Sequence, residues 1–153
     1  MTLAESTIVG RITPKEQGQV VACLRAVVAA APLFTPSLRG ETDMLVRVTN
    51  AGPYGWTSDE NGYRYVTHHP NGARWPEIPP LWIEIADRFA LVPGQRWDAA
   101  HIVWYAPGSS LGEHRDKTEH NLSGEVVTLS LGDPAVWVVV DDDGVRSRCD
   151  LYS

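Results

Sequence analysis

The sequence is poor in cysteine and has no long apolar run. Its 153 residues include two cysteines, Cys23 and Cys149, which are too few for a disulfide framework and lack the spacing of a zinc site. No apolar stretch approaches the roughly 20 residues that cross a bilayer, and the first residues lack the basic and apolar regions of a secretion signal. We therefore expect reduced cysteines, no membrane association and a cytoplasmic location.

An excess of basic residues is missing as well. Lysine and arginine total 13 against 19 aspartates and glutamates, which gives a formal net charge of −6, and no two basic residues are adjacent. General polyanion binders normally carry a basic excess or stripe. Any binding of nucleic acid must therefore depend on a local groove with few phosphate contacts, and its affinity should vary only modestly with salt. The 43% hydrophobic content is enough for one domain with a buried core.

Two helices are predicted in the first two thirds of the chain. Residues 14–31 follow a helical period, with Pro14 at a favourable first position, and residues 79–91 place a second set of apolar side chains on one face. Between them, residues 44–48 are rich in branched side chains and are typical of a strand. Asn61-Gly62 is a hairpin turn signal followed by alternating residues.

The last third of the chain predicts a series of short strands separated by turns. Glycine, proline and aspartate clusters punctuate the apolar segments, which is typical of a jelly roll or a sandwich. Helices followed by such strands predict an α+β fold. The predicted strands are 101–105, 126–131, 135–140 and 145–151.

His114 and Asp116 form the most informative pair of polar residues. Side chains two apart on a strand project to the same side, so the two can bind one metal ion as neighbours. Two histidines and one carboxylate hold one face of Fe(II) in many oxygenases and leave the other face open to a co-substrate and O₂. Taken alone the pair is a weak signal, because a surface histidine beside a solvated aspartate has the same spacing.

Several motifs in order give the pair a context. The chain contains Tyr105-Ala-Pro-Gly, then His114-x-Asp116-Lys117, then Thr128-Leu-Ser130-Leu-Gly132-x-Pro-Ala. Upstream stand Met44 through Asn50, Gly55-Trp56-Thr57, Gly62-Tyr63-x-Tyr65 and Trp75-Pro76. Over roughly residues 40 to 140 the sequence resembles the AlkB family of Fe(II)- and 2-oxoglutarate-dependent dioxygenases, of the bacterial type that repairs alkylated nucleic acids.

The resemblance implies one domain over residues 1–153. Its fold would be N-terminal helices packed on a double-stranded β-helix, or jelly roll, that is incomplete at its C-terminal end. The implied parts are a helical segment 1–40, a nucleotide-recognition lid 41–78, a helix within 79–98 and the first jelly-roll strands in 99–153.

The resemblance also implies roles for particular residues. His114 and Asp116 match the first two Fe(II) ligands and are the catalytic residues, and Tyr105 matches a tyrosine that binds 2-oxoglutarate. Trp56 and Tyr63 match lid aromatics that hold a flipped, alkylated base of single-stranded or duplex DNA or RNA. Ordinary packing remains an alternative for both aromatics, since such rings mostly serve the core.

Three residues depart from the family pattern within the matched region. Val103 replaces an asparagine that hydrogen-bonds 2-oxoglutarate, Thr118 occupies the substrate-binding position of an acidic residue that reads the base, and Glu125 replaces a proline. These changes leave the expected metal site intact but bear on which substrate the protein binds.

The family's second histidine ligand and its 2-oxoglutarate-binding arginines lie beyond Ser153. We therefore expect a piece of a longer protein, or a second chain that completes the fold, and weak activity of these 153 residues alone. His101 is expected to be a packed or hydrogen-bonded strand residue, and Arg146 and Arg148 are expected on a solvated strand face.

The resemblance makes oxidative dealkylation of methylated bases in DNA or RNA the leading hypothesis. One alternative keeps the same chemistry but directs it at a protein or small molecule, which the acidic net charge and Thr118 favour. The other is a non-catalytic jelly-roll domain, which the missing histidine and arginines and Val103 favour.

Overall fold

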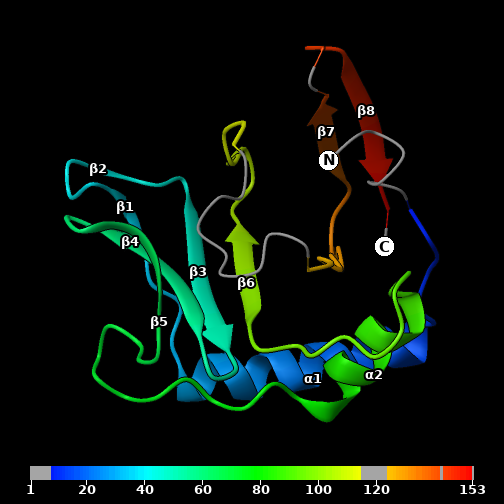
Figure 1. Ribbon diagram of the computed structural model, residues 1–153, viewed down its shortest axis with the longest axis horizontal. Coiled ribbons are helices and arrows are strands. Elements are labelled where there is room, and N and C mark those ends of the chain that lie inside the picture. The colour runs from blue at the N-terminus through cyan, green and yellow to red at the C-terminus, as the bar shows by residue number, and fades with distance from the viewer. Residues whose placement is uncertain (1–7, 115–123, 142, 153) are drawn as a thin grey trace.

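The computed structural model describes residues 8–114, 124–141 and 143–152, which form two helices and eight strands (Figure 1). The elements are α1 (Pro14–Ala30), β1 (Ser37–Leu38), β2 (Thr42–Asp43), β3 (Val46–Ala51), β4 (Gly55–Asp59), β5 (Gly62–Val66), α2 (Pro80–Phe89), β6 (Ala100–Tyr105), β7 (Ala135–Val140) and β8 (Arg146–Leu151). Neither described helix is long and apolar enough to cross a membrane.

Helix α1 begins at a capping box, which confirms the first predicted helix. The Thr13 side chain accepts a hydrogen bond from the Glu16 backbone N–H at 3.2 Å, and the Glu16 carboxylate accepts one from the Thr13 backbone N–H at 2.7 Å. Together they satisfy two backbone donors that the first turn of a helix leaves without partners. The buried face of α1 carries Val20 and Val27.

Helix α2 packs beside α1 and confirms the second predicted helix, with shorter ends. Ile85 of α2 joins Ile12 and Val20 in a buried apolar cluster. At its edge Arg88 pairs with Glu16 across the two helices, with an N···O distance of 2.6 Å. The Thr13 backbone hydrogen bond, then the Arg88 hydrogen bond, lower the pKa of Glu16 from 4.5 to about 2.

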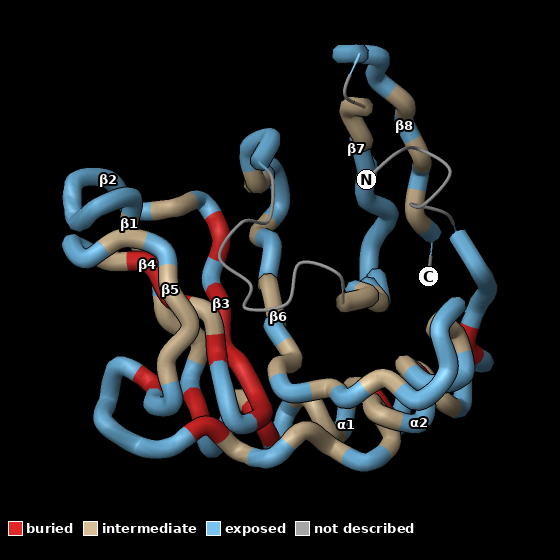
Figure 2. The backbone as a smooth tube through the Cα atoms, in the orientation of Figure 1, coloured by how far each residue is buried: buried red, intermediate tan, exposed pale blue. Residues whose placement is uncertain are grey.

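Strand β3 is the most buried strand of the described chain, as Figure 2 shows. It pairs antiparallel with β6 along its whole length, from Val46 opposite Tyr105 to Ala51 opposite Ala100. On its other edge Phe34 forms an isolated bridge with Val48. With β6 along one edge, the Phe34 bridge on the other and every residue except Arg47 buried, β3 is a firm base for the residues on β4 and β6.

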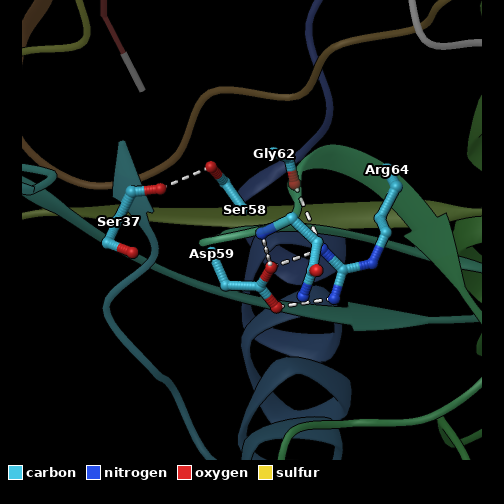
Figure 3. Close-up of polar contacts among 6 residues, drawn as sticks. Ser37, Ser58, Asp59, Gly62 and Arg64 are labelled. Carbon is cyan, nitrogen blue, oxygen red and sulfur yellow. Dashed lines mark hydrogen bonds and ion pairs between the residues drawn. The ribbon is translucent and has the colours of Figure 1, made fainter. Parts of the chain in front are cut away.

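Strands β4 and β5 form the hairpin predicted at Asn61-Gly62. Gly62 has a φ of 81°, a conformation that glycine adopts without strain. Arg64 grips Asp59 with both terminal nitrogens, at 2.5 and 2.6 Å, and the Ser58 hydroxyl donates to the Ser37 carbonyl at 2.5 Å (Figure 3). These contacts fix the hairpin turn and attach the hairpin to β1.

Strands β7 and β8 pair with each other, close to the predicted bounds, and all four pairings among the named strands are antiparallel. Within the described residues the sheets are separate two-stranded pairs, so they show helices with antiparallel strands but no closed barrel. All residues of β7 and β8 are exposed or half-buried (Figure 2).

The predicted strand 126–131 is wrong, because this segment forms no strand. Its start is held by Glu125, which accepts hydrogen bonds from the backbone N–H groups of Leu91 and Val92 at 2.7 and 3.0 Å. Its end is held by Leu131, which packs on the apolar cluster between the helices. A short apolar run can also lie in irregular backbone, so the pattern of apolar residues could not distinguish this segment from a strand.

We expect Glu16→Gln to flatten the acid dependence of stability. The folded pKa of Glu16 lies below its ordinary value, so its contribution is complete above about pH 4.5 and is lost as the pH falls toward 2. Urea unfolding at several pH values should show that the free energy of unfolding falls more steeply for the parent than for the variant between pH 4.5 and 2. Glu84→Gln, on the exposed side of α2, is the control and should keep the parent's slope.

Candidate active site

Asn50 lies at the centre of the candidate site and is completely buried. Its Nδ2 donates to the Trp56 carbonyl at 3.0 Å, and its Oδ1 accepts from the Trp56 backbone N–H at 3.0 Å. If the amide were reversed, its N–H₂ would face the Trp56 N–H and its oxygen would face the Trp56 carbonyl. The pair of hydrogen bonds therefore fixes which atom of the amide is oxygen. The start of β4 is thus attached to β3 through one side chain.

His101 of β6 completes this network. Its Nδ1 lies 2.9 Å from Asn50 Oδ1, and because that oxygen is an acceptor, Nδ1 must carry the proton. His101 as a residue keeps some exposure to solvent, but the surrounding protein displaces much of the water that would stabilise its cation. This desolvation, followed by repulsion from His114, lowers the pKa of His101 from 6.5 to about 4. At neutral pH His101 is therefore uncharged, with a lone pair on Nε2.

Trp56 lies between two other rings. Its indole stacks on Tyr63 at 5.7 Å between centroids and 23° between planes, and it meets His101 at 5.2 Å and 58°. Trp56 and Tyr63 are diagonal neighbours across the β4–β5 ladder, a separation that large aromatic rings span. Tyr63 is 51% exposed, so the aromatic group reaches the surface rather than serving only the core.

Gly55 allows β4 to approach β3 and Trp75. A Cβ at Gly55 would lie 2.5 Å from Trp75 Cε2 and 2.7 Å from the Asn50 Cβ, so no larger residue fits. Trp75 is held in turn, because its indole N–H donates to the Val66 carbonyl at 2.9 Å. This close approach explains why the hydrogen bonds between Asn50 and Trp56 can form.

His114 lies near enough to His101 to help lower the pKa of His101, but His114 does not lie on a strand. The prediction of a strand at His114 is therefore wrong, and Asp116 and Thr118 lie outside the described residues. The Gly112 carbonyl accepts a hydrogen bond from His114 Nδ1 at 2.8 Å, so in the neutral ring the lone pair is on Nε2. Metal-binding histidines commonly hold their second ring nitrogen in this way.

Tyr105 lies at the end of β6, on the strand face that also carries Val103 and His101. Tyr105 is 47% exposed, and partial burial raises its pKa, so its hydroxyl remains a donor at neutral pH. Val103 lies opposite the buried Val48. At the position where the family pattern has asparagine, this chain therefore extends its apolar core.

The remaining described histidines have structural contacts. His69 is buried, donates through Nε2 to the Pro32 carbonyl at 2.8 Å, and accepts at Nδ1 from the Asn71 backbone N–H at 3.0 Å. His68 is exposed and lies 2.8 Å from the Thr67 hydroxyl. Across residues 8–114, 124–141 and 143–152 no three potential ligands come together as a metal site.

The arginines of β8 lie on a solvated face, as predicted. Arg148 pairs with Asp150 of the same strand at 2.9 Å, with both side chains substantially exposed. Arg146 pairs with Glu113 at 3.0 Å and so connects β8 to the residue before His114. Exposed pairs of this kind contribute little stability, so the link orients more than it stabilises.

Comparison with known proteins identifies the family. Residues 6–151 match the 2OG-Fe(II) oxygenase superfamily. The chain belongs to this superfamily. Its similarity to proteins named alpha-ketoglutarate-dependent dioxygenase AlkB places it in the AlkB family, which confirms the resemblance seen in the motifs.

Three relatives illustrate the extent of the similarity. The Salmonella typhimurium AlkB is 36% identical over 72% of this chain and 53% of the relative, and the Escherichia coli AlkB is 32% identical over 88% and 64%. The Caulobacter vibrioides AlkB homolog is 39% identical over 61% of this chain and 43% of the relative. The chain thus spans about half the length of these relatives.

Sequence reasoning missed Asn50 as part of the site. The sequence offered little signal, because the strand Val46–Ala51 also contains Arg47 and Thr49, and no local pattern shows that Asn50 is the buried amide that needs partners. Its partners are a backbone unit of another strand and a histidine 51 positions away, which no local pattern specifies.

We expect Asn50→Ala to destabilise the protein by about 1–3 kcal/mol, because the Trp56 backbone loses both partners in a poorly solvated place. Hydrogen exchange at the Trp56 backbone amide should be faster in this variant than in the parent, because the amide loses its acceptor. The control is Thr49→Val, which removes the buried hydrogen bond from Thr49 to the Ala31 carbonyl. If Thr49→Val accelerates Trp56 exchange as much as Asn50→Ala does, the specific attachment is disproved.

Proposed function

We propose that this protein removes N-alkyl groups from bases of DNA or RNA by Fe(II)- and 2-oxoglutarate-dependent oxidation. The observation that carries the proposal is the grouping of His114, with its Nδ1 fixed on a carbonyl, near the aromatic group of Trp56, Tyr63 and His101 in an AlkB-family chain. A metal-ligand histidine beside flat, partly exposed rings suits a reaction on a planar substrate.

The proposed roles follow the donors that each residue offers. His114 Nε2 and the Asp116 carboxylate would bind Fe(II), and the Tyr105 hydroxyl would donate to 2-oxoglutarate. When bound, iron and 2-oxoglutarate supply the oxidation: one atom of O₂ enters succinate as CO₂ leaves, the other enters an N-methyl C–H bond, and formaldehyde is released. The protein itself orients the substrate and excludes water.

The β4–β5 hairpin would act as the lid over the substrate base. A base must leave the stack before its methyl group can be oxidised, and aromatic faces stabilise the extruded base. Tyr63, on the exposed side of the hairpin, would contact the nucleotide beside Trp56. Thr118 would contact the base edge.

The proposal extends to the arrangement of the fold and to the binding partner. The superfamily is built on a jelly roll, to which we assign β6, β7 and β8, with residues 41–78 as the lid within a single domain 1–153. The substrate would be single-stranded or base-flipped nucleic acid. Because the net charge is −6, stacking should contribute more of the affinity than phosphate contacts do.

We expect His114→Ala to lower iron-dependent formaldehyde release from methylated oligonucleotides by about a hundredfold or more, since loss of even an outer-shell partner of a metal costs about 10–100-fold. Mn(II) titration should show weaker binding in parallel. His68→Ala, at an exposed histidine on another loop, is the matched control and should retain both properties.

The assay should use the polypeptide at the length its gene encodes. Formaldehyde release that is unchanged in His114→Ala would contradict the assigned ligand. The acidic charge favours one second candidate, a dioxygenase acting on a protein or small molecule. Decarboxylation of 2-oxoglutarate stimulated by such a compound, with none stimulated by methylated DNA or RNA, would select it.

A further inference from the structure

We propose that a surface cavity between the β3–β4 turn and the start of α2 binds a small organic cation with an apolar body. The cavity has a volume of about 370 Å³. Its described lining residues are Gly52, Pro53, Trp75, Glu77, Ile78, Ile83 and Trp97. None of them is assigned to iron, 2-oxoglutarate or the substrate base, so this inference goes beyond the proposed function and does not depend on it.

The size and the lining of the cavity suit a molecule with one ring. Small-molecule sites commonly enclose roughly 300–1,000 Å³, and this cavity is near the lower end of that range. Apart from Glu77, every described side chain in the lining is a hydrocarbon or an indole. An apolar body would leave water for contact with these groups, which favours binding. We therefore expect most of the ligand to be apolar.

The walls of the cavity are held by contacts with neighbouring residues. Trp75 is buried, stacks on Phe34 at 6.3 Å between ring centroids and meets His69 edge-on at 5.2 Å. Gly52, in the β3–β4 turn, donates from its backbone N–H to the Pro76 carbonyl at 2.7 Å. Walls that are ordered before a ligand arrives reduce the entropy that binding costs. The cavity is therefore a preformed site.

The described side chains that line the cavity can accept hydrogen bonds from a ligand but have no donor to offer. The indole N–H of Trp75 already donates to the Val66 carbonyl at 2.9 Å, and that of Trp97 donates to Asp87 Oδ1 at 2.7 Å. Glu77 supplies a carboxylate, which accepts hydrogen bonds and donates none. A ligand carboxylate or phosphate would lose water here without gaining a donor from these side chains. A ligand that donates would find a partner.

The charges around the cavity favour a donor that is positive. Glu77 is exposed, so a bound cation could reach its carboxylate without full desolvation of either group. Donation from Trp97 to the Asp87 carboxylate increases the electron density of the indole and strengthens its attraction for a cation. No described lining residue is a lysine or an arginine, and the net charge of the chain is −6. An ammonium group on an apolar body meets all of these conditions.

Three probes with the same phenethyl body test this assignment. Phenethylammonium carries the cation, phenethyl alcohol replaces it with a neutral hydroxyl, and hydrocinnamate carries a carboxylate. Titration of the polypeptide at its encoded length, followed by the Trp97 indole N–H resonance in proton–nitrogen correlation spectra, would give each dissociation constant. The cation should bind about three- to thirtyfold more tightly than the alcohol, the range expected for one cation–π contact with one exposed ion pair. The anion should leave the resonance unchanged.

Glu77→Gln separates the charge of the cavity from its shape. The variant keeps the size of the side chain and an acceptor, so the affinity for phenethyl alcohol should stay the same. The preference for the cation over the alcohol should fall by about two- to fivefold, as expected for one exposed ion pair. Glu41→Gln, in the exposed turn between β1 and β2, removes the same charge elsewhere and should leave both affinities unchanged. The Trp97 resonance is assigned by its absence from the spectrum of Trp97→Phe.

A preference for the cation that Glu77→Gln reduces and Glu41→Gln keeps would support the assignment. Equal affinity for phenethylammonium and phenethyl alcohol, tighter binding of hydrocinnamate, or a Trp97 resonance that no probe shifts would overturn it. An equal effect of the two glutamine variants would also overturn it, because the preference would then reflect only the net charge of the chain. Shifts confined to the Trp56 resonance would place the probe at the candidate active site and would contradict the proposal. Formaldehyde release tests the proposed function separately.

Discussion

The amide of Asn50 is the interaction on which the rest of the site depends. It is completely buried on β3, and it holds the backbone of Trp56 on β4 and the ring of His101 on β6. A buried amide that lost these partners would carry the full desolvation penalty, so the three strands can separate only at considerable cost. The relative position of indole and imidazole is therefore a consequence of core hydrogen bonding and not of surface contacts.

The buried residues of the described chain lie around β3 and between the helices, and none lies in the β7–β8 hairpin (Figure 2). Strand β3 supplies the largest group of them, and β6 and the β4–β5 hairpin attach to β3 (Figure 1). The β7–β8 hairpin is joined to this scaffold near the site by the exposed pair of Arg146 and Glu113. We infer that the aromatic side of the site is preorganised and that the side beyond His114 is the more adjustable one, since exposed ion pairs constrain weakly.

The sequence predicted the elements whose signals are local. Pro14 with its helical period, the Asn61-Gly62 turn and the branched residues of β7 identified elements that the structure contains. The errors concern long-range contacts. Residues 126–131 look like a strand but are held by Glu125 and Leu131, and the role of Asn50 depends on partners on two other strands. The motifs predicted Trp56 and Tyr63 as site residues from their order in the chain, but they could not show that the ring of Trp56 lies against His101.

Under the proposed function, His101 and His114 would allow an acidic chain to bind an electron-poor base. Each donates its Nδ1 proton to a fixed oxygen, of Asn50 and of Gly112, so each places its lone pair on Nε2. Desolvation, to which the nearby His114 adds, lowers the pKa of His101 and favours its neutral form. An alkylated cytosine or adenine carries positive charge, which the indole face of Trp56 would stabilise without any basic residue. Recognition by aromatic faces would therefore reconcile a net charge of −6 with the proposed nucleic-acid substrate, because the base rather than the phosphate would supply the attraction.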